Sequence, residues 1–252
     1  AVKQWAALRL DVVCIQETHH NHMQHQCLLE RDLSQVTRQM HIQGWRVAAH
    51  SWSNSVHTAG VLILVRHSLA KALELTPPTP LPHNLAGRFT ECTLHWGGHR
   101  LHICNAYVPT GTTATAAEAK RELISSILAA TTTPRSIADN DTTRIWAGDF
   151  NFVEDPDKDS SAGPNGRRGD SSLARLLRTA GPNMVDSHRE LHPHRRDYTH
   201  LYCAPTHGGS RLDRIYINKE MLPLVCQTEI HFSSPSDPVS YTHLRAHETL
   251  MN

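Results

Sequence analysis

Residues 89–107, FTECTLHWGGHRLHICNAY, carry the clearest structural signal in the chain. Apolar and polar residues alternate along both arms of this stretch. The apolar ones are Cys92, Leu94 and Trp96 on the first arm, then Leu101 and Ile103 on the second. A period of two places such side chains on one face of a strand. Because the Gly97–Gly98 dipeptide suits a tight primed turn, the stretch predicts an antiparallel hairpin with one buried face.

Further strands are expected on both sides of this hairpin, and they outnumber the helices. The expected strands lie near 10–15, 45–50, 60–66, 145–147, 198–204, 212–217 and 225–232, and the expected helices near 26–40, 114–130 and 173–179. Neighbouring strands are mostly joined without helical crossovers. We therefore expect an α+β, mainly antiparallel, layered domain.

Composition indicates a soluble globular protein. Of the 252 residues, 39% are hydrophobic and 19% are charged, which excludes disordered and fibrous classes. Apolar runs stay far below the ~20 residues of a membrane span. Lys+Arg (25) balances Asp+Glu (24), so net charge by itself does not indicate nucleic-acid binding. The six cysteines show no C-x-x-C pairing and no secretory segment is evident, so we expect an intracellular protein with reduced thiols that is not secreted.

Four carboxylates lie at or near the ends of expected strands, where a loop can aim a side chain into a cleft. They are Glu17, Asp149, Asp213 and Asp237. Phosphodiester hydrolysis needs a divalent cation to neutralise the phosphate and a base to activate water, and carboxylates supply both. Strand ends are also polar for purely structural reasons, so spacing alone leaves both interpretations open.

The short strings around these residues narrow the choice. They are QET (16–18), NAYVP (105–109), GDFN (148–151), SRLD (210–213) and SD (236–237). In this order they resemble the endonuclease/exonuclease/phosphatase superfamily, over residues 1–237. The stretch 184–199, with Asp-x-x-Arg, His-Pro and Tyr-Thr, is similar to the apurinic/apyrimidinic-like endonuclease domain of LINE-type non-LTR retrotransposons. The resemblance implies one domain over 1–237, folded as a four-layer α/β/β/α sandwich of two mainly antiparallel sheets.

The resemblance also implies roles for the motif residues. Asp149 would orient or deprotonate the attacking water, and Asn151 would bond a phosphate oxygen beside it. Tyr107 would donate to the phosphate or the leaving group. Asp213 would pair with a histidine. From the residues alone, Tyr107 could equally be a packed strand aromatic and Asn151 a turn residue.

The same resemblance places Mg²⁺, or Mn²⁺ as an alternative, on Glu17 and Asp237. Two catalytic positions depart from the family pattern. Pro238 follows Asp237 where the family has His, and the first strand, with its metal-binding Asn, is expected to be missing before Ala1. Residues 238–252 are similar to the translation of a transposase-based sequencing adapter, so we expect a non-native or disordered tail. We therefore expect impaired activity from this chain.

Four residues of the 184–199 stretch are expected to support the site structurally: Asp186, Arg189, Tyr198 and Thr199. Asp186 and Arg189 could form an exposed helical pair of little energetic value or a buried pair that braces the site, and the family pattern favours the second.

DNA contacts are expected from Arg167 and Arg168, and a second basic patch lies at 195–196. Arginine can bind phosphates bidentately, although solvated loop charge explains such short patches too. The histidines at 19, 20, 22 and 25 lack the further ligands of a structural zinc site, so we interpret them as a solvated loop.

The sequence thus favours a Mg²⁺-dependent endonuclease that nicks target DNA to prime reverse transcription. The expected partners are DNA and a reverse-transcriptase domain encoded downstream, and no membrane association is expected. The expected location is the nucleus, which is inferred from the substrate alone. Two alternatives remain. One is a superfamily phosphatase acting on phosphoinositides or nucleotides, and the other is a decayed or domesticated domain that binds DNA without cutting it.

Overall fold

A computed structural model of the chain describes twelve ranges: residues 2–19, 23–39, 44–53, 59–74, 81–96, 99–111, 113–132, 142–163, 171–180, 183–202, 208–234 and 237–246. The chain divides into two compact units, residues 1–107 and 108–252.

Unit 1 contains two groups of antiparallel strands. Its elements are α1 (Val2–Ala7), β1 (Val12–Gln16), α2 (Met23–Gln39), β2 (Trp45–Ser51), β3 (Val61–Arg66), η1 (His67–Ala72), β4 (Leu73–Glu74), η2 (His83–Leu85), β5 (Phe89–Trp96) and β6 (His99–Tyr107). One sheet has the order β1-β3-β2, and in the other β4, β5 and β6 follow one another. β5 and β6 are the two arms of the predicted hairpin, which is confirmed.

The buried face of this hairpin packs against the first sheet. Cys92 and Leu94 of β5 and Ile103 of β6 form one apolar cluster with Ile63 and Val65 of β3. Alternation along β3 sends Leu62 and Leu64 to the opposite face of that sheet.

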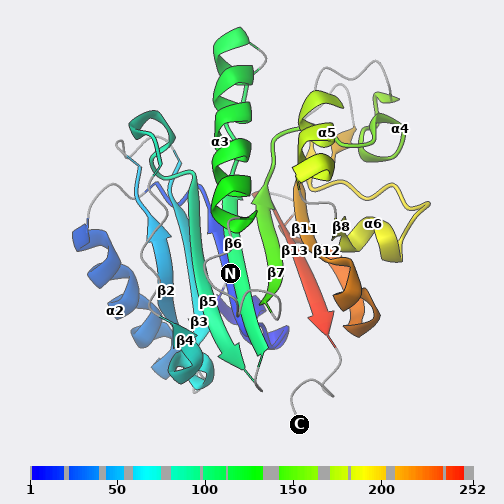
Figure 1. Cartoon of the computed structure of the whole chain (residues 1–252). Helices are drawn as coiled ribbons and strands as arrows, with labels where there is room; N and C mark the ends of the chain where they lie inside the picture. The colour runs from blue at the N-terminus through cyan, green and yellow to red at the C-terminus, as the bar shows by residue number, and fades with distance from the viewer. Residues whose placement is uncertain are drawn as a thin grey trace. The chain divides into compact units, whose positions relative to one another are not determined.

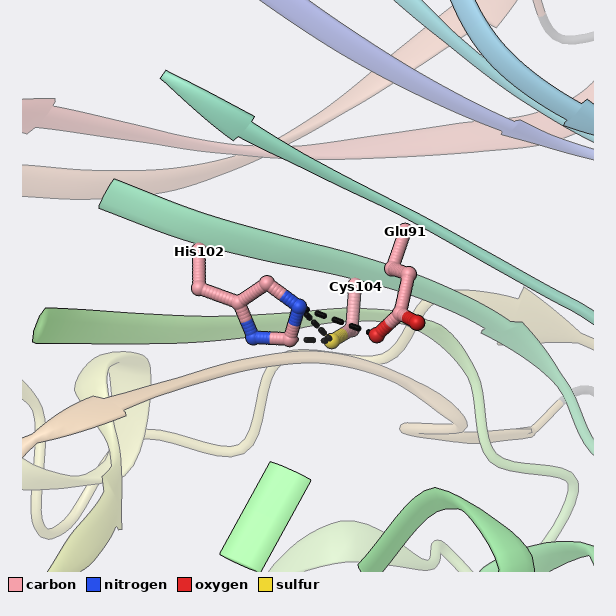
Figure 2. Close-up of side chains that lie close together, drawn as sticks. All are labelled: Glu91, His102 and Cys104. Carbon is pink, nitrogen blue, oxygen red and sulfur yellow. Dashed lines mark hydrogen bonds and ion pairs between the residues drawn. The ribbon is translucent and has the colours of Figure 1, made fainter. Parts of the chain in front are cut away.

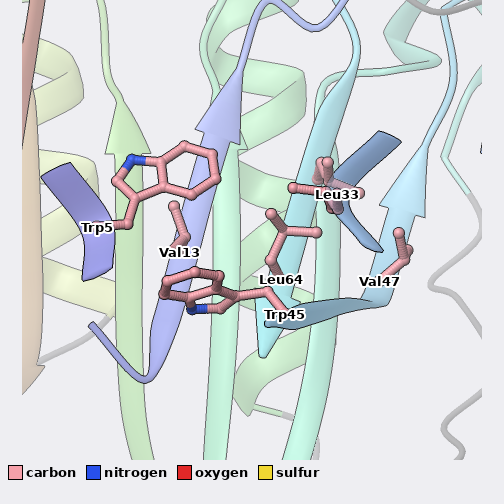
Figure 3. Close-up of a cluster of buried hydrophobic side chains, with 7 residues drawn as sticks. Trp5, Val13, Leu33, Trp45, Val47 and Leu64 are labelled. Carbon is pink, nitrogen blue, oxygen red and sulfur yellow. The ribbon is translucent and has the colours of Figure 1, made fainter. Parts of the chain in front are cut away.

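The helices of unit 1 cover that opposite face. Trp5 of α1 and Leu33 of α2 join Val13, Trp45 and Leu64 in a second apolar cluster (Figure 3). The Trp5 and Trp45 rings meet edge to face with their centroids 6.0 Å apart. Unit 1 is therefore a layer of helices over two sheets, with α2 alongside β2 (Figure 1).

Unit 2 is also α+β and antiparallel. Its elements are α3 (Ala114–Thr132), β7 (Thr142–Asp149), α4 (Pro156–Asp159), α5 (Ser171–Ala180), β8 (Met184–Asp186), α6 (Ser187–Leu191), β9 (His200–Leu201), β10 (Gly209–Ser210), β11 (Asp213–Asn218), η5 (Lys219–Leu224), β12 (Val225–Ser234) and β13 (Asp237–Ala246). β7, β11 and β8 lie in that order, and β9–β10 and β12–β13 form two separate pairs. The strand predicted near 198–204 is shorter than expected, since β9 covers only two residues.

Of the tail that we expected to be non-native or disordered, residues up to 246 are described, and 237–246 form β13, which pairs with β12. A backbone ladder needs no apolar alternation, which explains why the sequence shows no strand pattern here. Residues 247–252 lie outside the described part, and the origin of the tail stays a prediction. In the ranges that the structure describes, no helix is long and apolar enough to cross a membrane.

Candidate active site

In unit 1, Glu17 and Tyr107 meet at the ends of their strands. Tyr107, the last residue of β6, donates a hydrogen bond from Oη to Glu17 Oε1. Glu17 is exposed, and its backbone φ of 54° is a strained conformation for a residue other than glycine. The next N–H, that of Thr18, donates to the Gly60 carbonyl at 3.1 Å and fixes this turn. Because the Tyr107 ring is buried, with the Arg88 guanidinium 4.6 Å from its centroid, the hydroxyl is held in place.

Asn105 supports this group, and the sequence reasoning missed its role although it begins the NAYVP string. Its amide is fully buried and lies two residues before Tyr107 on β6. Nδ2 donates to the carbonyls of Ile15 (2.9 Å) and Leu62 (3.0 Å), and Oδ1 accepts from Gln16. The side chain therefore connects β6 to two strands of the other sheet, next to Glu17.

In unit 2, Asp149 and Asp213 are directly opposite each other. Asp149 ends β7, Asp213 begins β11, and the two are partners in the antiparallel register. Like charges opposite each other in a sheet repel, so a bound cation would relieve this arrangement.

Asn151 orients the Asp149 carboxylate through both oxygens. Its N–H donates to Oδ1 at 2.8 Å and its Nδ2 to Oδ2 at 3.0 Å. Nδ2 also donates to the Val108 carbonyl at 2.8 Å, which takes up the second amide hydrogen. The φ of Asn151 is 50°, a conformation that asparagine tolerates better than most residues. Asn151 is thus an orienting residue here, and its contact with phosphate stays a prediction.

Thr199 and Tyr198 lie beside the start of β11. The Thr199 hydroxyl accepts from the N–H groups of Leu212 (2.9 Å) and Asp213 (3.0 Å). A Cβ at Gly209 would lie 2.7 Å from the Tyr198 Cβ, so glycine is needed for this close approach. These contacts fix the backbone that carries Asp213.

Asp186 and Arg189 do not form the ion pair that we expected. Asp186 is the N-cap of α6, and its Oδ1 accepts from the N–H groups of His188 (3.1 Å) and Arg189 (3.2 Å). Its Oδ2 pairs with Arg211 at 2.7 Å. The Arg189 guanidinium instead pairs with Asp159. Capping turns the carboxylate toward the helix backbone and away from the Arg189 side chain.

Asp159 is the centre of a buried ion-pair network that the sequence did not reveal. Its Oδ1 lies 2.9 Å from Arg211 Nε and its Oδ2 lies 3.7 Å from Arg214 Nη2. Asp159, Arg211 and Arg214 are each at most 1% exposed. Burial by itself would raise the pKa of Asp159, but the two guanidiniums and hydrogen bonds from Arg211 and Arg189 outweigh it and lower the pKa to about 2. The SRLD string holds Arg211, whereas Asp159 lies 52 residues away in the chain.

A pocket of about 400 Å³ lies beside the second basic patch. Its lining includes Arg195, Arg196, Tyr198 and Leu201, and Leu201 is 47% exposed. Arg195 Nε lies 2.9 Å from Asp197 Oδ2, which holds this guanidinium at the rim. The carboxylates of Asp197 and Glu229 line the same pocket, so its charge is mixed.

The side chains of the remaining predicted site residues lie outside the described part of the chain. Arg167 and Arg168 lie outside the described residues. Asp237 begins β13 opposite Ser234, but its side chain is outside the described part. The donor sets that are described fit Mg²⁺: Glu17 in unit 1, and Asp149 with Asp213 in unit 2, offer the hard oxygen ligands that this ion prefers.

Comparison with known proteins defines the class. The chain belongs to the endonuclease/exonuclease/phosphatase family, whose model matches residues 1–237. This finding confirms the predicted family and the α+β fold with two sheets.

Solved structures share the fold at low sequence identity. An AP endonuclease from Archaeoglobus fulgidus is 18% identical with a TM-score of 0.71, covering 97% of this chain and 90% of that one. The AP endonuclease LMAP from Leishmania major is 18% identical with a TM-score of 0.70, covering 97% and 81%. The 3′-5′ exonuclease NExo from Neisseria meningitidis is 16% identical with a TM-score of 0.69, covering 97% and 93%. No match to a curated protein sequence was found.

Proposed function

We propose that the chain is a Mg²⁺-dependent phosphodiester hydrolase that nicks DNA. The observation that carries this proposal is the Asp149 carboxylate, held through both oxygens by Asn151 and placed opposite Asp213. A carboxylate oriented in this way is suited to position a water molecule and accept its proton.

The other roles follow from local geometry and from the motifs. Glu17 would hold Mg²⁺ through its exposed carboxylate, and Asp237 is proposed as a second ligand. When bound, Mg²⁺ supplies positive charge that neutralises the phosphate. The Tyr107 hydroxyl, fixed by its buried ring, would donate to the phosphate or the leaving group.

We further propose that the nick primes reverse transcription of a retrotransposon. The support is the resemblance of residues 184–199 to LINE-type endonuclease domains, together with the pocket lined by Arg195, Arg196 and Tyr198. AP endonuclease structures with this fold make DNA the favoured substrate. A reverse-transcriptase domain encoded downstream and a nuclear location are part of the same proposal.

The test is nicking of supercoiled plasmid, with enzyme in excess, in Mg²⁺ and in chelator. The chain should nick slowly, because Pro238 offers no proton donor or acceptor where the family motif has His. Pro238→His should raise the rate by about 100-fold, the usual lower range for general acid–base catalysis. Asp149→Asn in the Pro238→His background should remove this gain.

Two controls complete the experiment. Asp32→Asn, at an exposed residue paired with Arg31, should leave the nicking rate of the Pro238→His protein unchanged. The same proteins are assayed on nucleoside and inositol phosphates. Faster turnover of these small phosphoesters than of DNA, or DNA binding without any Mg²⁺-dependent nick in the Pro238→His protein, would contradict the proposal.

A further inference from the structure

Three side chains of metal-binding types gather in unit 1, and none of them belongs to the candidate active site. Glu91 of β5 lies opposite Cys104 of β6, and His102 is the next residue of β6 on the same face (Figure 2). His102 Nε2 lies 2.9 Å from Glu91 Oε2, and Cys104 Sγ lies 3.8 Å from His102 Nδ1 and 4.0 Å from Nε2. One ligand atom from each side chain lies within 4.8 Å of the others.

These spacings are close to those of a tetrahedral zinc site. With Zn–N and Zn–O near 2.0–2.1 Å and Zn–S near 2.3 Å, tetrahedral angles separate N from O by about 3.4 Å and N from S by about 3.5 Å. One ring nitrogen binds one ion, so the relevant separations are those of His102 Nε2, which lies 2.9 Å from Glu91 Oε2 and 4.0 Å from Cys104 Sγ. Each differs from these values by about half an ångström. Small side-chain rotations would therefore admit the ion.

Charge and burial favour a divalent, thiophilic ion. Glu91, His102 and Cys104 are 5%, 8% and 1% exposed. A carboxylate and a thiolate together carry two negative charges, which a divalent cation neutralises in a buried place where an unbalanced charge is costly. Thiolate and imidazole ligands select Zn²⁺ over Mg²⁺.

The cluster is separate from the candidate nuclease residues of the same strand. Along β6, His102 and Cys104 occupy one face and Asn105 and Tyr107 alternate with them on the other. An ion at the cluster would crosslink β5 to β6 behind Tyr107, and its role would be to stabilise this hairpin.

We propose that Glu91, His102 and Cys104 form a binding site for Zn²⁺, independent of the Mg²⁺ of the nuclease reaction. Three protein ligands leave one tetrahedral position for a non-protein ligand. Binding replaces the contact between His102 Nε2 and Glu91 with two metal bonds. The imidazole then carries its hydrogen on Nδ1 instead of Nε2, and the thiol proton of Cys104 is released to solvent.

The test uses Co²⁺ as a spectroscopic probe on the chelator-stripped full chain. We expect one equivalent of Co²⁺ to give thiolate-to-cobalt charge-transfer absorption, and one equivalent of Zn²⁺ to abolish it. Cys104→Ser should remove the absorption, and Cys104→Ser and His102→Gln should each weaken Zn²⁺ binding, measured by competition with a chelator, by more than about 100-fold. Zn²⁺ should raise the thermal midpoint of the chain but not that of Cys104→Ser.

Matched controls remove a different thiol. Cys92→Ala acts on the opposite face of the same hairpin, where Cys92 pairs with Ile103, and Cys226→Ser removes an exposed thiol. Both should keep the absorption and the Zn²⁺ affinity. Glu91→Gln, which keeps the size of the side chain, should weaken Zn²⁺ binding by about 10-fold or more, and circular dichroism verifies the folding of each variant. Absorption that survives Cys104→Ser, or that disappears with Cys226→Ser, would overturn the proposal.

Discussion

Replacement of Asp159 by asparagine should destabilise the chain by about 2.5–5 kcal/mol. The decrease of the Asp159 pKa from 3.8 to about 2 corresponds to about 2.5 kcal/mol of preference for the ionised form in the folded chain. Removal of one partner from a buried ion pair costs about 3–5 kcal/mol, because the other charge stays buried. Here Arg211 and Arg214, each 1% exposed, would lose the carboxylate that they share and would keep the weaker balance of Asp186, which lies 2.7 Å from Arg211.

The pH dependence of the stability follows from the direction in which the pKa of Asp159 is shifted. Because the pKa of Asp159 is lower in the folded chain than in the unfolded chain, its contribution is complete above about pH 4. The contribution is lost as the pH decreases from about 4 to about 2. Asp159→Asn should therefore have lower stability at pH 7 and a flatter decrease in acid.

Urea unfolding followed by tryptophan fluorescence measures both effects, at pH 7 and in steps down to pH 2. Asp32→Asn is the matched control, since Asp32 pairs with Arg31 while their side chains stay 62% and 68% exposed, and such pairs contribute less than about 1 kcal/mol. An Asp159→Asn loss below about 1 kcal/mol at pH 7, or an acid limb as steep as that of the unsubstituted chain, would refute the reasoning.

Three other substitutions test the candidate site. Tyr107→Phe removes the donor to Glu17 but keeps the buried ring, so the nicking rate should decrease about 100-fold with little change in thermal midpoint; an unchanged rate would contradict this role. Thr199→Val removes the acceptor of two N–H groups, including that of Asp213, and should cost about 1–3 kcal/mol in urea unfolding, most of which Thr199→Ser should restore. Asn105→Leu removes three buried hydrogen bonds and should cost about 2–3 kcal/mol by the same measurement, so a stability equal to that of the unsubstituted chain would argue against them.

Local patterns predicted the regular elements of the fold well. The alternation of apolar residues and the Gly97–Gly98 dipeptide were sufficient to predict β5 and β6, and helical periodicity predicted α3. The patterns missed α6, since a five-residue helix has too few turns for a periodic signal, although Asp186 supplies its N-cap. β13 was missed because its support is a backbone ladder with β12 rather than a side-chain pattern.

The candidate site could be predicted only in part. Asp149 and Asp213 were recognisable as candidate site residues because each lies at a strand end within a short motif. The register of β7 and β11 places them opposite each other. The contact between Asp159 and Arg211 joins residues 52 apart, and no local pattern specifies it. For Asp186 and Arg189, proximity in the chain suggested a pair, whereas the buried charges selected other partners.

The buried network has a consequence for any attempt to split unit 2. A cut between residues 192 and 210 would leave the carboxylates Asp159 and Asp186 on one fragment and both guanidiniums, Arg211 and Arg214, on the other. The fragment that carries the two guanidiniums would have to bury uncompensated charge in order to fold, so it should remain open until it meets its complement. Reassembly would then be selective, because a fragment without the Asp159 carboxylate could not balance the charges of Arg211 and Arg214. Unit 2 is therefore a suitable starting point for a two-fragment complementation system in which recognition is electrostatic and internal.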